Sequence, residues 1–446
     1  MLRRINSLTK TGDANFAEII SHTFWAVLML GGATVLQFVF DLILTHSYGA
    51  HGAGVFYLGF SVLMVLALIG RLGLDQAVVR FIPPLLKINP GAASGVRRAA
   101  VELSLLLTIP LAIGLFVAAP WLATEVFHSD ELTIYLRIFA LAVPPFSLMY
   151  VFSGTLRSMK HTRAALSIER AGMYTFGILA IITLGRLYGL GGLVSGFVVG
   201  LFLTAILGAL HIHRYMPRFK QLIPFSRKQL LIVSAPLLFV AFATQMNGQA
   251  SVLILGAVSD NASVGIFNIA LKVSMLMSLI LAAVNVIAAT KISELYSAKQ
   301  KEELDIMISK ISALGTAVGL PLFIFMSVFS TFLLGLFGHE FKAGALALII
   351  LTAGQFVNVA VGSTNYILAM TGHEKALSIA VGLSLLLNII LGLVLIPPLG
   401  VLGASISASA AMISGNIIMV VMVKKYLDVW PLPFKYMAKW IKAVSL

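Results

Sequence analysis

The chain has 446 residues, of which 59% are hydrophobic and 11% charged, and its formal net charge is +14. Because globular domains are about a quarter charged, this composition excludes a soluble protein and predicts an all-α polytopic membrane protein. The sequence contains no cysteine, which excludes disulfides and thiolate metal sites.

Apolar stretches long enough to cross a bilayer recur along the whole chain. A spanning helix needs about 20 apolar residues at a rise of about 1.5 Å per residue. Twelve such stretches can be counted, at residues 21–45, 52–72, 99–122, 134–156, 171–187, 190–212, 230–257, 264–289, 308–337, 343–369, 376–396 and 401–423. The sequence therefore predicts twelve transmembrane helices.

The basic residues predict the orientation of these helices. If the amino terminus is cytoplasmic, 27 of the 31 Lys and Arg residues fall in cytoplasmic segments. The exceptions are Arg137, Arg186 and Lys342 near the outer face, and Lys272 inside a span. This excess of inner positive charge predicts that both termini are cytoplasmic. Since topology accounts for the positive charge, we expect no nucleic-acid partner.

An internal repeat relates the two halves of the chain at a constant offset of 211 residues. Gly54-Val55-Phe56 corresponds to Gly265-Ile266-Phe267, and Pro110 to Pro321. Because each copy holds six spans, both enter the membrane from the same side, and a binding region is expected at their interface near the midplane. The predicted domains are an amino-terminal six-helix lobe (1–215), a cytoplasmic linker (216–229), a carboxy-terminal six-helix lobe (230–427) and an interfacial cytoplasmic tail (428–446).

Three amides lie close together in the seventh span. Helical spacing places Gln245 and Gln249 on one face and Asn247 on another. One interpretation is interhelical hydrogen bonding, and the other is the polar wall of a cavity. For the polar residues of the tenth span, which include Gln355, Asn358 and Asn365, interhelical hydrogen bonding is the favoured interpretation.

Lys272 lies eight residues into the eighth span, near the middle of the hydrocarbon core. A cation at this depth is unfavourable in free energy unless it has a counter-ion or a functional role. Three interpretations stay open: a cavity lysine that binds an anion, a buried partner of Asp41 or another carboxylate, and a lysine that snorkels outward. Asn268 lies one turn above Lys272 on the same side of the helix.

Asp41 lies in the outer part of the first span. It is either a carboxylate that couples transport to a Na⁺ or H⁺ gradient or an interfacial residue that snorkels to the outer surface. Arg80 and Lys291 are equivalent under the 211-residue offset, at the cytoplasmic mouth. They either attract an anionic head group or only contribute to the inner positive charge.

Signatures of enzymes are missing from the sequence. It has no metalloprotease histidine pair, no phosphate-binding P-loop and no cysteine nucleophile. All predicted outer loops are short, which leaves no place for the carboxylates of a membrane glycosyltransferase. We therefore expect a transporter, with no catalytic residues, no metal site and no bound cofactor.

The segment "YGAHGAGVFYLGFSVLMVLALIGRLGLDQAVVRFIPPLL", residues 48–86, resembles the second-helix region of oligosaccharide flippases. These belong to the multidrug/oligosaccharidyl-lipid/polysaccharide (MOP) exporter superfamily. The residues that carry the resemblance are Gly54, Phe56, Leu74, Asp75, Arg80, Phe81, Ile82 and Pro83. The duplicated twelve-span layout extends it over essentially the whole chain.

The resemblance implies a V-shaped pair of six-helix bundles, as in MATE transporters, in the cytoplasmic membrane of a prokaryote. Spans one, two, seven and eight would line a central cavity. It also implies alternating access, which moves polyprenyl-linked oligosaccharides from the inner to the outer leaflet, often driven by a cation gradient. Polysaccharide polymerases or glycosyltransferases are further implied partners, besides membrane lipid.

The site expected from the residues and the resemblance together has three parts. Its members are the cavity residues Lys272, Asn268, Gln245, Asn247 and Gln249, the ion-coupling candidate Asp41, and the cytoplasmic-mouth cations Arg71, Arg80 and Lys291. Two alternatives of the same fold are a cation-coupled drug or metabolite antiporter and a lipid II flippase. The antiporter would call for more acidic residues in the central spans, and lipid II flippases commonly have more spans.

Overall fold

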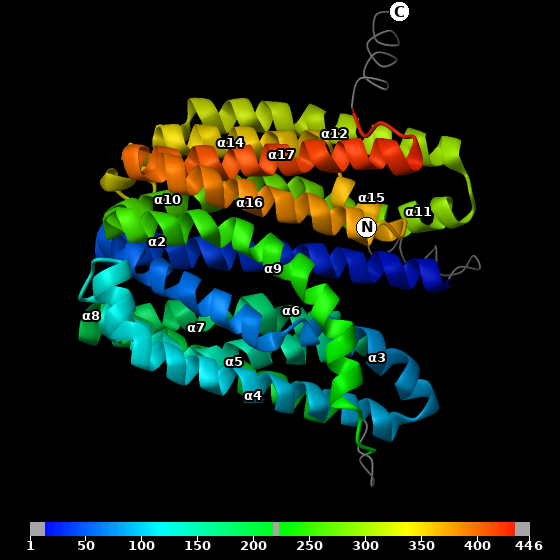
Figure 1. The fold of residues 1–446 in the computed structure, drawn as a ribbon, viewed down its shortest axis with the longest axis horizontal. Coiled ribbons are helices and arrows are strands. Elements are labelled where there is room, and N and C mark those ends of the chain that lie inside the picture. Colours follow the sequence, from blue (N-terminus) through cyan, green and yellow to red (C-terminus); the bar gives the residue numbers. More distant parts are fainter. Residues whose placement is uncertain (1–13, 217–222, 433–446) are drawn as a thin grey trace, which may run out of the picture. The chain divides into compact units, whose positions relative to one another are not determined.

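The computed structural model describes residues 14–216 and 223–432, which form helices joined by short turns (Figure 1). Parts of the predicted linker and tail, 217–222 and 433–446, lie outside the described residues. The α-helices are α2 (Ala14–Arg71), α3 (Leu74–Ile88), α4 (Pro90–Trp121), α5 (Leu132–Ser158), α6 (Thr162–Leu166), α7 (Met173–Ala180), α8 (Arg186–Tyr215), α9 (Arg227–Val258), α10 (Asn261–Ser274), α11 (Ser278–Ser297), α12 (Lys301–Val328), α13 (Ser330–Gly335), α14 (Ala345–Ala360), α15 (Thr364–Met370), α16 (Glu374–Leu399) and α17 (Val401–Leu427).

Contacts within the chain divide it into two compact units. The first unit consists of Met1–Phe40, Leu66–Phe116 and Ile138–Ala235, and the second of Asp41–Val65, Val117–Arg137 and Pro236–Leu446. The second unit therefore contains the middle of α2, the end of α4 and the start of α5, most of α9, and the helices that follow it. The contacts of Asp41, Lys272 and the amides of α9 described below lie inside this second unit.

Helix α2 is a hairpin of two antiparallel helices. Its turn is at Gly49, where φ is 64° and ψ is −169°, a conformation that glycine adopts at little cost. Asp41 and Tyr57 lie on either side of this turn, and their side chains are joined by a hydrogen bond of 2.8 Å. Sixteen residues of straight helix would separate them by roughly 24 Å. The predicted spans 21–45 and 52–72 are thus separate helices.

Nine helical runs among the described residues are long and apolar enough to cross a membrane. The difference from the twelve predicted spans has local causes. Two runs, Gly31–Arg71 and Thr162–Tyr215, each contain a glycine kink, at Gly49 and Gly189, and each covers two predicted spans. The predicted span 264–289 is divided by a 3₁₀ turn at Met275–Met277.

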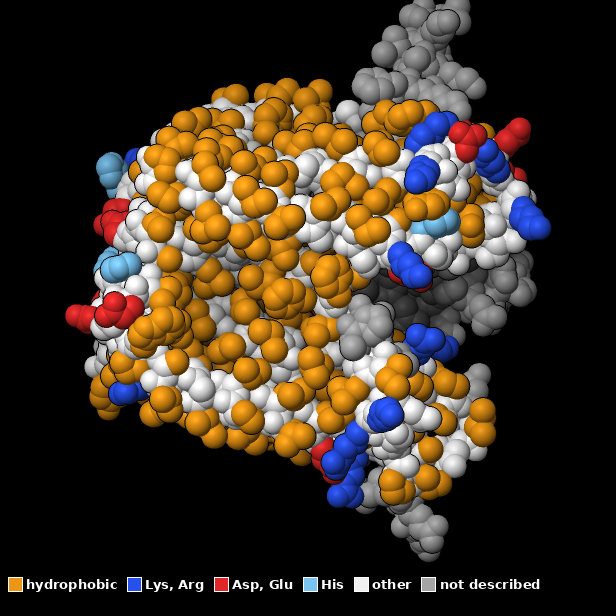
Figure 2. All heavy atoms as spheres, in the orientation of Figure 1, with side chains coloured by type: hydrophobic (Ala, Val, Ile, Leu, Met, Phe, Trp, Pro, Cys, Tyr) orange, Lys and Arg blue, Asp and Glu red, His pale blue; other side chains and the backbone are white. Residues whose placement is uncertain are grey.

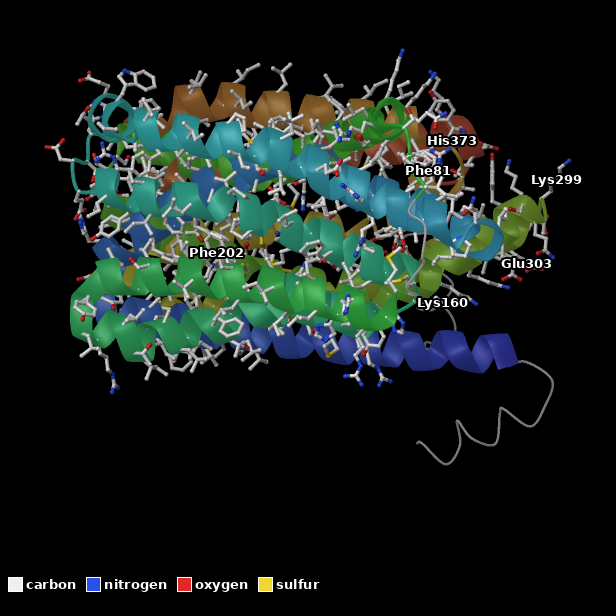
Figure 3. The ribbon with its side chains drawn as sticks, turned by 90° about the horizontal axis from the view of Figure 1, so that it is seen from below. Phe81, Lys160, Phe202, Lys299, Glu303 and His373 are labelled. Atoms are coloured by element: carbon white, nitrogen blue, oxygen red, sulfur yellow. The ribbon has the colours of Figure 1, made fainter. Side chains whose placement is uncertain are left out.

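The surface of the helices is apolar along their length and charged at their ends. In each unit, hydrophobic side chains cover the visible flanks, and Lys, Arg, Asp and Glu side chains gather near helix termini (Figure 2). Leu393 and Val394 on α16 are 61% and 62% exposed. Lys299 and Glu303 lie at the turn between α11 and α12 (Figure 3). This distribution is typical of helices surrounded by lipid.

A close contact between helices α2 and α10 is built on two glycines. A Cβ atom added to Gly54 would lie 1.6 Å from the carbonyl oxygen of Asn261, and one added to Gly265 would lie 2.2 Å from that of Ala50. Under the 211-residue offset Gly54 corresponds to Gly265, and Ala50 to Asn261. Replacing each residue of one contact by its equivalent in the other repeat therefore gives the other contact. Small residues allow such backbone approach between membrane helices.

Replacing Gly54 by alanine is expected to force α2 and α10 apart and to destabilise the protein by more than the ~1–3 kcal/mol of ordinary overpacking, since the obstacle is backbone. The measurement is thermal unfolding of the purified protein in detergent. Gly114→Ala on α4 is the control, because no atom lies within 4 Å of its added Cβ. Equal melting temperatures for the two variants would contradict the contact.

Candidate functional site

The backbone around Lys272 is shaped by polar residues at both ends of α10. The Asp260 side chain caps the start of the helix by accepting a hydrogen bond of 2.9 Å from the Ser263 N–H. Hydrogen bonds from Ser263 lower the pKa of Asp260, because they favour its ionised form. At the other end Ser274 Oγ donates to the carbonyl of Leu271 at 2.7 Å, next to the 3₁₀ turn. Lys272 is thus in the last turn of α10, directly before this 3₁₀ turn.

Lys272 forms a buried ion pair with Asp41. Its Nζ atom donates to Asp41 Oδ1 at 2.7 Å, and the Tyr57 hydroxyl donates to the same oxygen at 2.8 Å. The side chain of Asp41 is 1% exposed, and that of Lys272 is 18% exposed. Nζ also lies 4.1 Å from the centre of the Tyr57 ring, a cation–π geometry. A carboxylate, a phenol and an ammonium group thus form one cluster.

These contacts decide between the interpretations that the sequence left open. Lys272 bonds to a buried carboxylate, so the proposal that it snorkels to the outer surface is wrong. Asp41 is fully buried, so it is not an interfacial carboxylate either. The interpretation of Lys272 as a buried partner of Asp41 is confirmed, and the 18% exposure leaves part of the lysine open to other ligands.

The two oxygens of the Asp41 carboxylate differ in their hydrogen bonding. Oδ1 accepts from both Lys272 and Tyr57, whereas Oδ2 is buried without a hydrogen-bond partner among the described residues. An unsatisfied buried oxygen costs about 1–3 kcal/mol or more when charged. Oδ2 is chemically suited to hold a proton or to coordinate a small cation.

The amides of α9 face in two directions, as their spacing predicted. Gln245 and Gln249 are half-buried and point to Met64 in the second half of α2, with Nε2 to Sδ distances of 3.8 and 3.7 Å. Asn247 lies on another face, where its backbone carbonyl accepts from Asn388 Nδ2 at 2.9 Å and its side chain lines a cavity. Only the first pair therefore contacts α2, the helix that carries Asp41.

The remaining cavity candidate, Asn268, is buried one turn before Lys272 on α10. Under the 211-residue offset it corresponds to Tyr57, the residue whose ring and hydroxyl contact the ion pair. Sequence reasoning did not single out Tyr57, because an isolated tyrosine in an apolar span resembles a packing or interfacial residue. Its place in the repeat, opposite Asn268, is the signal that could have identified it.

The expected cations of the cytoplasmic mouth have local partners. In the first unit, Arg71 lies 3.9 Å from Asp75, and its guanidinium is 4.1 Å from the centre of the Tyr150 ring. Arg80 is exposed on α3. In the second unit, Lys291 is exposed and donates to Glu294 at 2.9 Å.

Lys291 does not join the ion pair of the same unit. Nineteen residues separate it from Lys272, roughly 28 Å of helix at 1.5 Å per residue.

Comparison with known proteins defines the class. The profile of the polysaccharide biosynthesis protein family matches residues 20–290, and the MatE profile matches residues 236–394. An uncharacterized membrane protein of Methanocaldococcus jannaschii is 23% identical over 413 residues, which are 86% of this chain and 79% of the relative. A probable low-salt glycan biosynthesis flippase of Haloferax volcanii is 24% identical over 381 residues, covering 84% of this chain and 77% of the flippase.

Solved structures show the same fold. The lipid II flippase MurJ in an inward closed conformation superposes with a TM-score of 0.75 at 17% identity, over 90% of this chain and 87% of that chain. An inward-facing multidrug resistance MATE transporter of the MOP superfamily gives 0.74 at 16% identity, over 90% and 98% of the two chains. The molecule is therefore a multi-pass membrane protein with a MATE-like fold. Because its profile covers more than half of the sequence, the chain belongs to the polysaccharide biosynthesis protein family.

Replacing Lys272 by methionine is expected to leave the Asp41 charge buried and uncompensated, at a cost of about 3–5 kcal/mol. The double variant Asp41→Asn/Lys272→Met removes both charges and is expected to recover most of this loss. Unfolding free energies of the four proteins in detergent form a double-mutant cycle. Lys291→Met is the control, because its exposed pair contributes about 1 kcal/mol or less. Additive effects of the Asp41 and Lys272 changes would show that the pair is not coupled.

Proposed function

We propose that this protein is a flippase that translocates a polyprenyl-(pyro)phosphate-linked oligosaccharide across the cytoplasmic membrane of a prokaryote for surface polysaccharide biosynthesis. The observation that carries the proposal is the Lys272 ammonium group, held at mid-span by Asp41 and partly exposed. The family match and the name of the Haloferax volcanii relative support a glycan substrate.

The chemistry of such a substrate suits the proposed cavity. A pyrophosphate head cannot enter hydrocarbon without a replacement for water, because desolvation of a charge costs many kcal/mol. Lys272 supplies the cation, and Gln245, Asn247, Gln249 and Asn268 supply amides for sugar hydroxyls. The polyprenyl tail stays in the surrounding lipid. Arg71, Arg80 and Lys291 would attract the head group at the cytoplasmic mouth.

The transport cycle we propose is alternating access between two parallel six-helix bundles, 1–215 and 230–427, joined by the linker 216–229. Both termini are placed in the cytoplasm, with the tail 428–446 at the membrane surface. The contacts of Gly54 and Gly265 support the parallel arrangement of the two bundles. The 211-residue offset converts each contact into the other, as a two-fold axis along the membrane normal would require. The glycine turns at Gly49 and Gly189 support the separation of the twelve spans.

Asp41 is proposed as the site of coupling to a Na⁺ or H⁺ gradient. Its unpartnered Oδ2 atom supports this role. The same atom is the specific observation that favours the second candidate function, a cation-coupled drug or metabolite antiporter. A lipid II flippase is a third candidate that shares the mechanism and the fold. Polysaccharide polymerases or glycosyltransferases would be partners of the first function only.

Deletion of the gene distinguishes these functions. The proposed flippase predicts loss of the surface glycan and accumulation of its lipid-linked unit on the inner leaflet, assayed by glycan staining and by extraction of lipid intermediates. Unchanged glycans with altered drug sensitivity would instead establish the antiporter. Loss of cell-wall peptidoglycan precursors from the outer leaflet would establish the lipid II flippase.

The role of Lys272 is tested by downhill flipping of a fluorescent lipid-linked saccharide in proteoliposomes without an ion gradient. Asp41→Asn provides a background in which Lys272 can be changed without leaving a buried anion. In that background Lys272→Gln is expected to slow flipping at least tenfold per folded protein, because the phosphate loses its cation, whereas Lys291→Gln changes the rate little. Flipping at the rate of the Asp41→Asn parent would remove Lys272 from the substrate site.

A further inference from the structure

A cavity of about 340 Å³, which Asn247 helps to line, lies inside the second unit, between α9, α10, α14, α15, α16 and α17. It is within the size range of small-molecule sites, which is roughly 300–1,000 Å³. None of the described residues that line it is ionisable. Its amide-bearing residues are Asn247, Gln355, Asn358, Asn365 and Asn416.

Two of these amides present acceptors that nothing in the described part of the protein satisfies. Asn416 on α17 is 3% exposed, and its Nδ2 donates to the Met412 carbonyl at 2.9 Å, but its buried Oδ1 has no partner. The buried Oδ1 of Asn247 on α9 has none either. Buried polar atoms are nearly always hydrogen-bonded, so two orphan acceptors in one cavity indicate a donor that enters it.

Neighbouring amides show that packing alone does not explain these orphans. Gln355 accepts from Ser278 Oγ at 2.6 Å. Asn388 accepts from Ser251 at 3.0 Å and donates to the Asn247 carbonyl at 2.9 Å. Among the buried side-chain amides of the described residues, Asn247 and Asn416 are the two with an unpaired oxygen, and both line the cavity.

A neutral hydroxylated group would supply the missing donor. A polyprenyl or acyl chain carries no donor and would leave both oxygens unsatisfied. A bare cation would need several oxygen ligands and a compensating charge, and the described lining residues include no carboxylate. The rest of the lining includes apolar residues such as Leu271 and Met275, which suit the C–H face of a sugar ring.

The position of the cavity connects it with the ion pair. Leu271 and Met275, which line it, flank Lys272 in the sequence, on the last turn of α10 and the 3₁₀ turn that follows. The cavity and the ammonium group thus lie on neighbouring sides of one helix segment. Met275 is 41% exposed, and the lining residues Thr244 and Asn365 are exposed as well, which marks an entrance.

We infer that this cavity is a binding site for one neutral sugar residue of the lipid-linked head group, whose hydroxyls donate to Asn416 Oδ1 and Asn247 Oδ1. The inference rests on the proposed function and adds a second contact region to it. Lys272 would hold the phosphate, and the amide cavity would select the sugar.

The test uses two probes and the full-length protein in nanodiscs. One probe is a polyprenyl pyrophosphate, and the other is the same lipid carrying one N-acetylglucosamine residue. The wild-type protein is expected to bind the glycosylated probe more tightly. Asn416→Leu removes one acceptor and is expected to lower only that affinity, by roughly three- to tenfold, the loss of one hydrogen bond.

A second variant fills the cavity without removing a hydrogen bond. No atom lies within 4 Å of a Cβ added to Gly248, which lines the cavity, so Gly248→Leu can be accommodated and would occupy the sugar site. Its affinity for the glycosylated probe is expected to fall to that for the bare pyrophosphate. Gly114→Leu, whose added Cβ also meets no atom, is the matched control on α4 and should change neither affinity.

The outcomes separate the inference from the proposed function. Equal wild-type affinities for the two probes would overturn the sugar site while leaving the flippase intact. A second outcome would also overturn the sugar site. In it, Na⁺ stabilises the wild-type protein, Asn416→Leu abolishes this stabilisation, and the sugar has no effect, which assigns the cavity to a cation. Failure of the wild-type protein to bind either probe would overturn the proposed function itself.

Discussion

The ion pair between Asp41 and Lys272 is the constraint around which this part of the molecule is organised. Two opposite charges in a membrane interior are tolerated only if they meet and if protein, not lipid, surrounds them. The turn at Gly49 brings Tyr57 back beside Asp41, and the capped start of α10 places Lys272 opposite. The close approach of α2 and α10 at Gly54 and Gly265 holds the two helices near enough for the pair to form.

The helix contacts correspond in the two repeats, whereas the ion pair consists of residues at which the two repeats differ. The contacts of Gly54 and Gly265 exchange under the 211-residue offset, but the two charged residues of the ion pair do not. Lys272 corresponds to Ser61, and Asp41 corresponds to Val252, both of which are buried. One repeat therefore contributes the carboxylate and the other the ammonium group. The duplication accounts for the helix contacts that the two repeats share. The differences at Asp41 and Lys272 give the two repeats opposite charges at the ion pair.

Much of this was predictable from the sequence, and the failures have definite causes. Hydrophobic length and the repeat predicted the helices and the correspondence of their contacts. The sequence left open whether Asp41 is interfacial, because the first apolar stretch ends near residue 45, whereas the helix continues to the turn at Gly49. Eight residues before that turn, Asp41 lies roughly 12 Å below it. The amide cavity was missed because Gln355 and Asn416 come together only through the packing of α14 and α17.

Under the proposed function, the charges of the pair link substrate and coupling ion. With Asp41 ionised, the pair is neutral, and an arriving phosphate meets the carboxylate as well as the ammonium group. Neutralisation of Asp41 through its free Oδ2 atom, by a proton or a cation, leaves Lys272 with an unbalanced positive charge. Cation binding then strengthens phosphate binding, and reciprocity requires that phosphate binding strengthens cation binding by the same factor. A single buried pair thus links the affinity for an anionic head group to the binding of a cation.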